Sequence, residues 1–414
     1  MRDSSPCPVF SGDGGSVLLA TTVVTLLATA LVMGAAYEVG VRMESRALLR
    51  RGLAASASAQ AGLEAAAPLA ADSGFRVGAG RQELWMDARA IGPATVVVRA
   101  SDPGDGVLEP APAAGSSLAD TVRLDATATV EGVTRRMRAE VLPLPHPALR
   151  YAVCSGGALQ WSLVSVEGRV RANGNVTMTQ SGDLYGDLTT LVGASVSSSF
   201  DDTDTDIFFS PDSLVPPALD FEWFLKAGEP ITLPEFPSLS NCVITPQINP
   251  YGAPSSTGIY AIEANDQNVY LSNMAVVACL VIHNARTVYI SDAVGSPAPY
   301  YHESPDPQRL PALLVDGDLV MRVEGGGAWL VSLGGQERTL GSGLKGVFAC
   351  TGSFLGPQQY ASLPIVLEGA VLAASISLSG PGTRIRHDPR LNTTPLAQMI
   401  GTGVRLLPGS TEAL

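Results

Sequence analysis

Lysine is nearly absent from this chain of 414 residues. Lys226 and Lys345 are the two lysines among 26 basic residues, which face 39 acidic ones. The formal net charge of −13 repels phosphate backbones, so nucleic-acid binding loses its usual electrostatic contribution. The same charge disfavours peripheral attachment to an anionic lipid surface. We therefore expect no nucleic-acid partner.

Sequence motifs of catalysis and nucleotide binding are also missing. The four histidines occur without H-E-x-x-H, and there is no G-x-S-x-G motif. The segment from Gly341 to Gly346 satisfies G-x-G-x-x-G, but a β-like sequence follows it where a dinucleotide site needs a helix. We expect His146, in the proline-rich segment 143–149, to be exposed to solvent. The sequence predicts no catalytic residue, no nucleotide and no other cofactor.

Glycine and proline are abundant instead, at 43 and 30 residues, without a G-X-Y period. This composition suits a turn-rich β protein better than a helical bundle. Only 16% of residues are charged and 46% are apolar, so a packed core is expected.

The N-terminal region holds one long apolar run without a charged side chain, from Val17 to Tyr37. As a helix this run spans ~30 Å, the hydrocarbon thickness of a bilayer. A cleavable secretory signal with a cut before Tyr37 is the alternative, but the run is longer than usual signals and only Arg2 precedes it as a cation. We expect a retained transmembrane helix. Its membrane segment includes Val17, Leu18, Leu19, Leu26, Leu27, Leu31 and Val32.

The alanine-rich stretch 38–67 has no proline and continues the same helix. A short polar leader ending in Gly14 and Gly15, an apolar run and a helical continuation together resemble the N-terminus of type IV pilins and type II secretion pseudopilins. The whole chain resembles minor pilin-like proteins that have a PilX-type N-terminus and a large β-rich body. The resemblance implies cleavage by a prepilin peptidase after Gly15, leaving Ser16 first. Asp13 and Ala20 depart from that pattern, which usually has a basic residue and a glutamate there.

The charge pattern gives a conflicting orientation. Arg42, Arg46, Arg50 and Arg51 follow the span, and the positive-inside rule would place them in the cytoplasm. The resemblance implies the opposite: a single-pass protein of the bacterial inner membrane with an exported C-terminal domain, incorporated in a surface filament.

The fold class we expect is α+β, mostly β. A leader at 1–15 precedes the helix at 16–71, a small antiparallel β domain at 72–147 and a β-helix-like domain at 148–400 with an insertion at about 198–240. The small domain is predicted from two alternating strands, 121–130 and 133–141, joined by the turn Glu131-Gly132.

The parallel β-helix, or solenoid, is predicted from internal repeats. NDQNVYLS (265–272) returns as NARTVYIS (284–291) at an offset of 19, and Gly346, Val347 and Ala349 echo Ala370, Val371 and Ala373 at an offset of 24. On this reading Tyr270 and Tyr289 lie in successive coils and stack. A β-sandwich is the competing fold. The proline-rich segment 297–311 is not expected to form a central strand.

Four cysteines fall within the predicted body. Cys154, Cys242, Cys279 and Cys350 lack C-x-x-C spacing, so a zinc site is not expected. In an exported domain they allow two disulfides, and buried free thiols are the equal alternative.

Two acidic groups are candidates for ligand chemistry. Asp202, Asp204 and Asp206 match the first ligands of a calcium loop, but Ile207 stands where glycine is needed, so a solvated loop is preferred to calcium. Asp316 and Asp318 flank a glycine, as in sugar-degrading β-helix enzymes, although a turn needs the same residues.

The sequence therefore predicts a membrane-anchored pilin-like structural subunit of a type IV pilus or type II secretion-like apparatus, with an assembly or adhesion role and no catalysis. Its expected partners are other pilin or pseudopilin subunits, the inner membrane and a prepilin peptidase. The alternatives are a surface β-helix carbohydrate-active enzyme and an anchored polymer-forming scaffold unrelated to pili.

Overall fold

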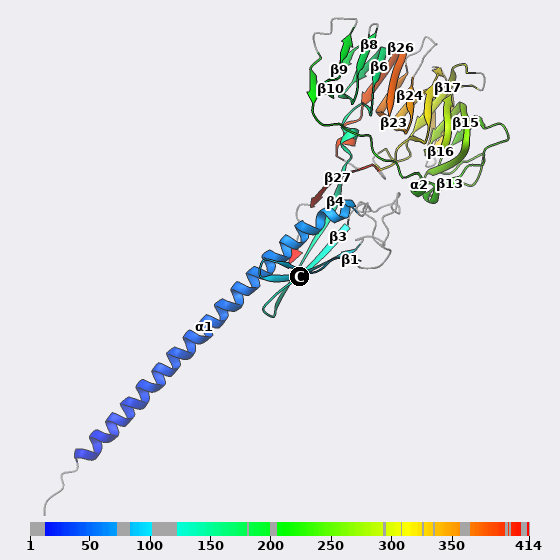
Figure 1. Cartoon of the computed structure of the whole chain (residues 1–414). Coiled ribbons are helices and arrows are strands. Elements are labelled where there is room, and N and C mark those ends of the chain that lie inside the picture. The colour runs from blue at the N-terminus through cyan, green and yellow to red at the C-terminus, as the bar shows by residue number, and fades with distance from the viewer. Residues whose placement is uncertain are drawn as a thin grey trace, which may run out of the picture.

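The protein has one long N-terminal helix followed by two β-rich parts. The computed structural model describes residues 13–72, 83–101, 122–179, 182–198, 205–292, 295–307, 309–324, 327–333, 336–356, 365–393, 396, 399–406 and 412–413. Helix α1 (Asp13–Asp72) has 60 residues and is about 90 Å long. Its N-terminal part extends away from the remaining structure as a free rod (Figure 1).

The C-terminal part of α1 packs on a small sheet through small side chains. Ala55, Ala59, Leu63 and Ala66 recur every three or four residues and are buried on one face of the helix. Gly62 lies on the same side, and a Cβ added there would be 2.5 Å from Val96 Cγ1. Helix and sheet therefore approach too closely for a larger residue at this position.

This small sheet is antiparallel, as the sequence predicted. It contains β1 (Glu83–Ile91), β2 (Ala94–Ser101), β3 (Val122–Val130), β4 (Val133–Pro145) and β27 (Ile400–Leu406) in that order, and β28 (Glu412–Ala413) also pairs with β4. The turn between β3 and β4 has Glu131 at φ +43° and Gly132 at φ +83°. Positive φ at both central residues gives the type of turn that matches strand twist in a two-residue hairpin.

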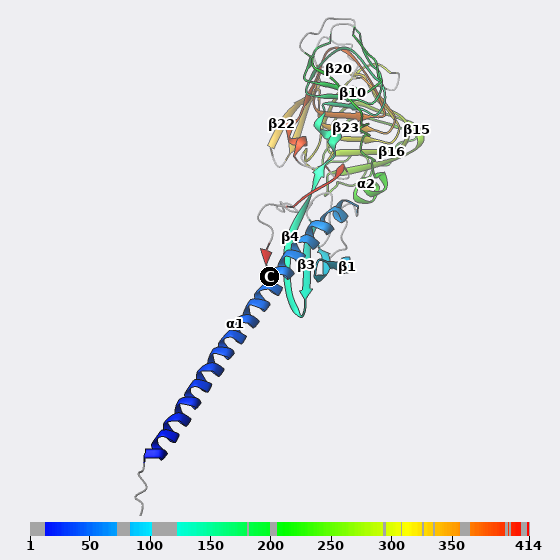
Figure 2. The same cartoon turned by 60° about the vertical axis from the view of Figure 1, so that its left-hand side comes forward.

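The two last strands of the sheet come from the far end of the chain. β27 pairs with β4 through Val404 opposite Pro143 and Leu406 opposite Val141. The chain thus leaves the sheet through β4, forms the large β-rich body and returns to the same strand. Figure 2 shows the body above the sheet, with the C-terminus beside α1.

The body, residues 153–387, consists mainly of short parallel strands. Its first group is β5 (Val153–Ser155), β6 (Leu159–Glu167), β7 (Val170–Ala172), β8 (Val176–Thr179), β9 (Leu184–Tyr185), β10 (Leu188–Leu191), β11 (Val196–Ser198) and β12 (Ile207–Ser210). Successive turns of chain stack, since β5 pairs with β7, β7 with β10 and β10 with β12. The inward-facing Val, Leu and Ala side chains of these turns form one core.

The second group stacks in the same way after a crossover that includes helix α2 (Phe221–Ala227). It comprises β13 (Glu229–Pro230), β14 (Ser238–Ile244), β15 (Ile259–Val277), β16 (Cys279–Ile290), β17 (Ala298–Glu303), β18 (Leu313–Val315), β19 (Asp318–Met321), β20 (Val323–Glu324), β23 (Gly343–Cys350), β24 (Ser353–Leu355), β25 (Val366–Ala373) and β26 (Ser375–His387). The strands β25 and β26 meet β5 and β6. The chain therefore enters and leaves the body in the middle of the stack.

The sequence prediction is confirmed at the coarser level of a long apolar helix, an antiparallel sheet and a large β-rich body. One uninterrupted solenoid from residue 148 to 400 is not observed. Along one row the order is β12, β10, β7, β5, β25, β23, β18, β16, β15, β13. Repeat offsets indicate which neighbouring turns pair, but they carry no information on where the chain enters the stack. The fourth turn, β12, falls inside the segment expected as an insertion.

The offset of 19 is correct, and the offset of 24 is wrong. Tyr270 lies opposite Tyr289, with ring centroids 5.1 Å apart and nearly parallel planes. Gly346 pairs with Gly369, an offset of 23, and both have positive φ. A Cβ on Gly369 would lie 1.8 Å from the carbonyl oxygen of Gly346. The register is therefore fixed by stacking glycine on glycine, which the apolar pattern alone did not reveal.

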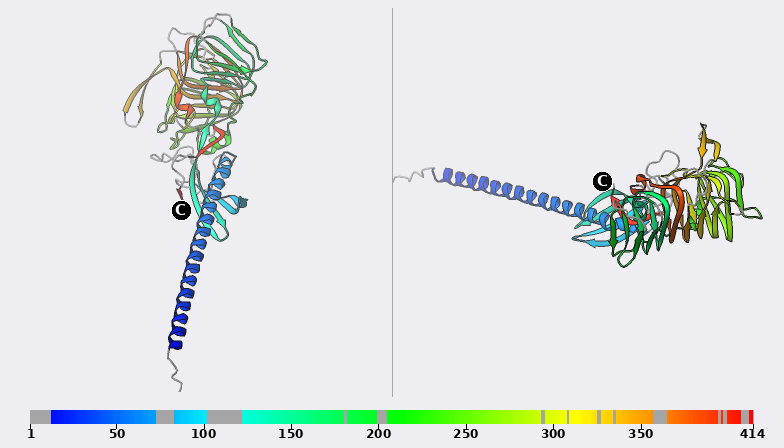
Figure 3. Two further views of the ribbon diagram at one scale, coloured as in Figure 1. Left: turned by 90° about the vertical axis from the view of Figure 1, so that its left-hand side faces the viewer. Right: turned by 90° about the horizontal axis from the view of Figure 1, so that it is seen from above.

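The proline-rich segment 297–311 also differs from expectation, because it contains the central strand β17. Its partners are β15, β20 and β23, and Tyr300 and His302 are completely buried. Proline is tolerated because Pro299 lies near the start of the strand. A separate antiparallel hairpin, β21 (Ala328–Leu333) and β22 (Gln336–Gly341), projects from the body (Figure 3).

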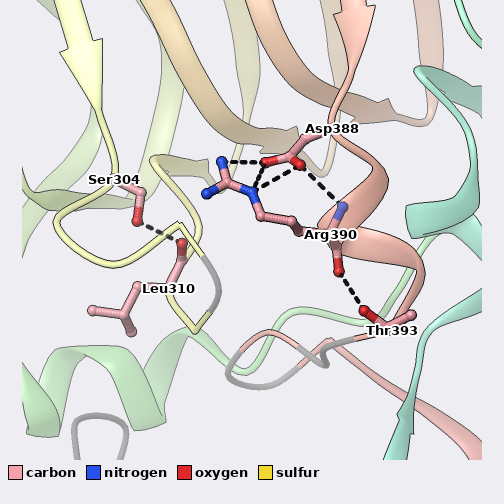
Figure 4. Close-up of polar contacts among 5 residues, drawn as sticks. All are labelled: Ser304, Leu310, Asp388, Arg390 and Thr393. Atoms are coloured by element: carbon pink, nitrogen blue, oxygen red, sulfur yellow. Dashed lines mark hydrogen bonds and ion pairs between the residues drawn. The ribbon is translucent and has the colours of Figure 1, made fainter.

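Two short 3-10 helices join the body to the sheet, η1 (Pro147–Arg150) and η2 (Pro389–Asn392). Asp388 caps η2 by accepting the Arg390 main-chain N–H at 3.0 Å, and the Arg390 guanidinium binds the same carboxylate at 2.8 Å (Figure 4). Burial opposes ionisation of Asp388, but the bonds from Arg390 prevail and lower the pKa of its carboxyl group. Nearby, the Ser304 hydroxyl donates to the Leu310 carbonyl at 2.7 Å.

Candidate functional site: the exposed apolar helix

The most unusual surface of the molecule is the N-terminal part of α1. Leu19, Leu26, Leu31 and Val32 are each at least 68% exposed, and Leu27 is 60% exposed. Water-exposed leucine and valine of this density on one element is unfavourable, since each side chain gains about 1.5–3 kcal/mol when fully buried. The exposed rod therefore requires an apolar environment that this chain does not itself supply.

The length and composition of this exposed segment suit it to a lipid bilayer. A window of 18 residues in Leu19–Leu69 has a mean hydropathy of 2.0, and none of it is buried. Among the described residues α1 is the one helix that meets these criteria. Thr25 and Thr29 lie in this segment, and their hydroxyls donate to the carbonyls four residues earlier, at 2.7 Å each. Their polar groups are thus satisfied within the helix, as a bilayer requires.

The predicted processing position lies at the start of this helix. Gly15, Ser16, Val17 and Leu18 belong to the helical backbone of α1, but their side chains fall outside the described residues. Residues 1–12, the first part of the predicted leader, also lie outside them.

Charged groups follow the apolar segment on the same helix. Arg42 pairs with Glu38 one turn earlier, and Arg51 pairs with Glu131 of the β3–β4 turn at 2.7 Å. The second pair ties the helix to the tip of the sheet at the level where its side chains begin to be buried. The change from exposed apolar to packed helix therefore occurs within a few turns after Tyr37.

Comparisons with known proteins give little further information. No family model and no curated protein matches the chain. A solved structure, described as the crystal structure of the competence-associated pilin ComZ from Thermus thermophilus, is similar over 88% of this chain and 97% of that chain, with 10% sequence identity and a TM-score of 0.32. At this score the likeness carries no argument about fold or function.

The four cysteines of the body are free thiols in this structure. Cys154, Cys279 and Cys350 are buried and Cys242 is partly exposed. Burial raises the pKa of the Cys154 and Cys350 thiols to about 12 and also raises the pKa of Cys279 and Cys242. The three buried cysteines are therefore unreactive packing residues, because the thiolate is the reactive form.

The carboxylates of Asp316 and Asp318 are engaged by the neighbouring turn. Asp316 Oδ1 accepts the Thr351 hydroxyl at 3.1 Å, and Asp318 Oδ1 accepts the main-chain N–H of Ser353 at 2.7 Å. Between them Gly317 has φ +141°, and a Cβ there would lie 2.0 Å from the Ala285 carbonyl oxygen. This geometry belongs to a tight corner between turns.

Sequence reasoning missed a polar ladder that includes Asp316. His283 Nδ1 lies 2.7 Å from Glu263 Oε2, and its Nε2 lies 3.4 Å from Asp316 Oδ2, so three successive turns are linked. Burial opposes ionisation of Glu263, but the His283 hydrogen bond helps lower the pKa of its carboxyl group. The Glu263–His283 step of this ladder has an offset of 20, whereas the neighbouring tyrosines have an offset of 19. The register shifts between these two pairs, where Asn265 and Asp266 both have positive φ.

The other candidates form no site in the part of the chain that is described. Asp202 and Asp204 lie outside it and Asp206 is exposed, and no described cluster of three His, Cys, Asp or Glu residues could hold a metal. Gly341 ends β22 and Gly343 begins β23, so the glycine-rich motif opens no helix. His146 was expected to be exposed, but it is half-buried, and its Nδ1 accepts the Ala148 N–H at 3.2 Å and so caps η1.

Proposed function

We propose that this protein is a pilin-like structural subunit, anchored by the N-terminal part of α1 in the bacterial inner membrane and carrying its sheet and body outside. One observation carries the proposal: the same helix is fully exposed and apolar at one end and packed on a sheet at the other. Burying the apolar end in lipid or among similar helices removes its contact with water. The stacked parallel body, which we interpret as a β-helix entered at its middle, then projects outward for assembly or adhesion.

The proposed partners follow from the two ends of this helix. The membrane and the helices of other pilin or pseudopilin subunits, in a type IV pilus or a type II secretion-like apparatus, take up the apolar end. A prepilin peptidase cuts after Gly15. Processing is tested by intact mass of the protein from its own organism: the chain should begin at Ser16. Gly15→Leu should retain the leader, while the neighbouring Gly14→Ala should still be cut. An unchanged N-terminus in Gly15→Leu would refute peptidase processing.

We propose no catalytic role. The support is that both carboxylates of the Asp-Gly-Asp corner already accept hydrogen bonds from the next turn. Activity on a panel of polysaccharides that disappears in Asp316→Asn, with the fold retained, would favour the carbohydrate-active alternative instead.

A further inference from the structure

The two ends of the stacked body differ in how well their inward-facing side chains are covered. At the β13–β14 end the inward-facing residues are covered, because Ile231 is 4% exposed and Leu239 and Ile244 are completely buried. Tyr251 packs against this end of the core, and its hydroxyl accepts the main-chain N–H of Ser240 at 3.1 Å. The chain itself therefore caps this end, as a stack of β turns requires.

At the opposite end, no described strand covers the last turn of the stack. β12 is the last strand there, and in the described part of the chain its register partners all belong to β10. Val170, Leu188 and Ile207 stand in one inward-facing row, and their exposures are 0%, 0% and 43%. In the next inward-facing row Phe209 pairs with Thr190. Phe209 is 53% exposed, whereas Thr190 is completely buried. Ile207 and Phe209 thus occupy core positions that the next strand would cover.

Such an edge is suited to bind one more strand. The side of β12 away from β10 presents main-chain donors and acceptors, and its apolar side chains would become core when a strand is added. Phe208 on the outer face and Val192 beside the strand are also exposed, at 50% and 66%. The stack therefore ends on an apolar surface in a chain that caps its other end.

The charges around β12 indicate what kind of strand can bind beside it. Asp206 precedes the strand and Asp212 follows it, both exposed; Arg171 binds the main-chain oxygen of Asp212, not its carboxylate. A second copy added antiparallel would bring Asp206 of one chain near Asp212 of the other, and like charges across strands are destabilising. A strand with a basic residue at each end meets both carboxylates favourably.

We propose that the β12 edge binds, by strand addition, an extended segment of another protein with alternating apolar residues and a lysine or arginine at each end. This site is separate from the apolar helix and does not depend on the proposed anchoring. The probe is a fluorescein-labelled peptide, Lys-Val-Thr-Val-Thr-Val-Arg, titrated with the full chain in phosphatidylcholine nanodiscs. Fluorescence anisotropy measures binding, with empty nanodiscs as background.

The basic peptide should bind about tenfold more tightly than the acid-ended peptide Glu-Val-Thr-Val-Thr-Val-Glu. Phe209→Asp should weaken binding by about tenfold or more because it places a charge at a core position. Leu330→Asp, at an exposed leucine of the β21–β22 hairpin, should leave binding unchanged. The double variant Asp206→Asn, Asp212→Asn should remove most of the preference for the basic peptide.

Three results would overturn the proposal. The first is equal affinity for the basic and acidic peptides in the wild-type chain. The second is unchanged binding by Phe209→Asp. The third is concentration-dependent self-association in sedimentation that Phe209→Asp abolishes, because the occupant would then be a second copy of this chain.

Discussion

His302 is expected to make the body sensitive to acid. The imidazole is completely buried in β17 between Tyr300 and Phe348. Its Nε2 lies 3.1 Å from the Ala278 carbonyl oxygen, which can only accept, so Nε2 carries the proton. Nδ1 then accepts from the Tyr300 hydroxyl at 2.8 Å. Both ring nitrogens are thus satisfied in the neutral form, and burial disfavours the charged form.

The size of the effect follows from the pKa of His302. Burial lowers this pKa to about 4 from an ordinary value of 6.5. Between these values the unfolded chain binds more protons than the folded chain, so stability is complete above pH 6.5 and falls as the pH drops toward 4. The integrated loss from neutral pH to about pH 4.5 is ~2.5 kcal/mol.

The assay is equilibrium denaturation of the full chain in detergent, followed by tryptophan fluorescence, to which Trp161, buried in the body, contributes. His302→Gln keeps a donor and an acceptor but does not titrate. The wild type should lose ~2.5 kcal/mol more than the variant when the pH falls from 7 to about 4.5. Parallel pH profiles of the two proteins would show that His302 is not a buried neutral group.

Other predictions concern packing and thiol reactivity. Gly62→Leu should lower the free energy of unfolding of the small sheet by about 1–3 kcal/mol through overpacking. The control Gly40→Leu should not, because a Cβ at Gly40 has nothing within 4 Å. Equal thermal midpoints for the two variants would contradict the close contact between helix and sheet. Tyr270→Ala should cost at least ~1 kcal/mol in chemical denaturation because it removes two stacked ring contacts, and a neutral effect would argue against the stack. In native iodoacetamide labelling read by mass spectrometry, Cys242 should react before Cys279, and early labelling of Cys279 would contradict its burial.

The sequence predicted the local features well, because they leave periodic signals. The alternation in 122–130 gave the β3 strand, and the repeated V-Y-[LI]-S segments gave the pairing of Tyr270 with Tyr289. The apolar run gave the exposed part of α1. Each of these depends on neighbours in the chain or on one constant offset between two turns.

The non-local features left no such signal. The return of β27 to β4 and the contact of β26 with β6 join segments more than 200 residues apart, and nothing in their composition marks the partner. The Glu263–His283 contact needs an offset that two residues with positive φ alter locally. β17 was missed because Pro299 lies within it, near its first residue, where proline is tolerated although a proline-rich sequence argues against a central strand.

The central claim is that the exposed apolar part of α1 is embedded in a membrane. It is tested most directly by washing membranes of the native organism with alkaline carbonate and probing the fractions for this protein. We predict that the protein remains in the pellet and is released only by detergent. Recovery of the protein in the wash, with a chain that begins at Tyr37, would contradict the account.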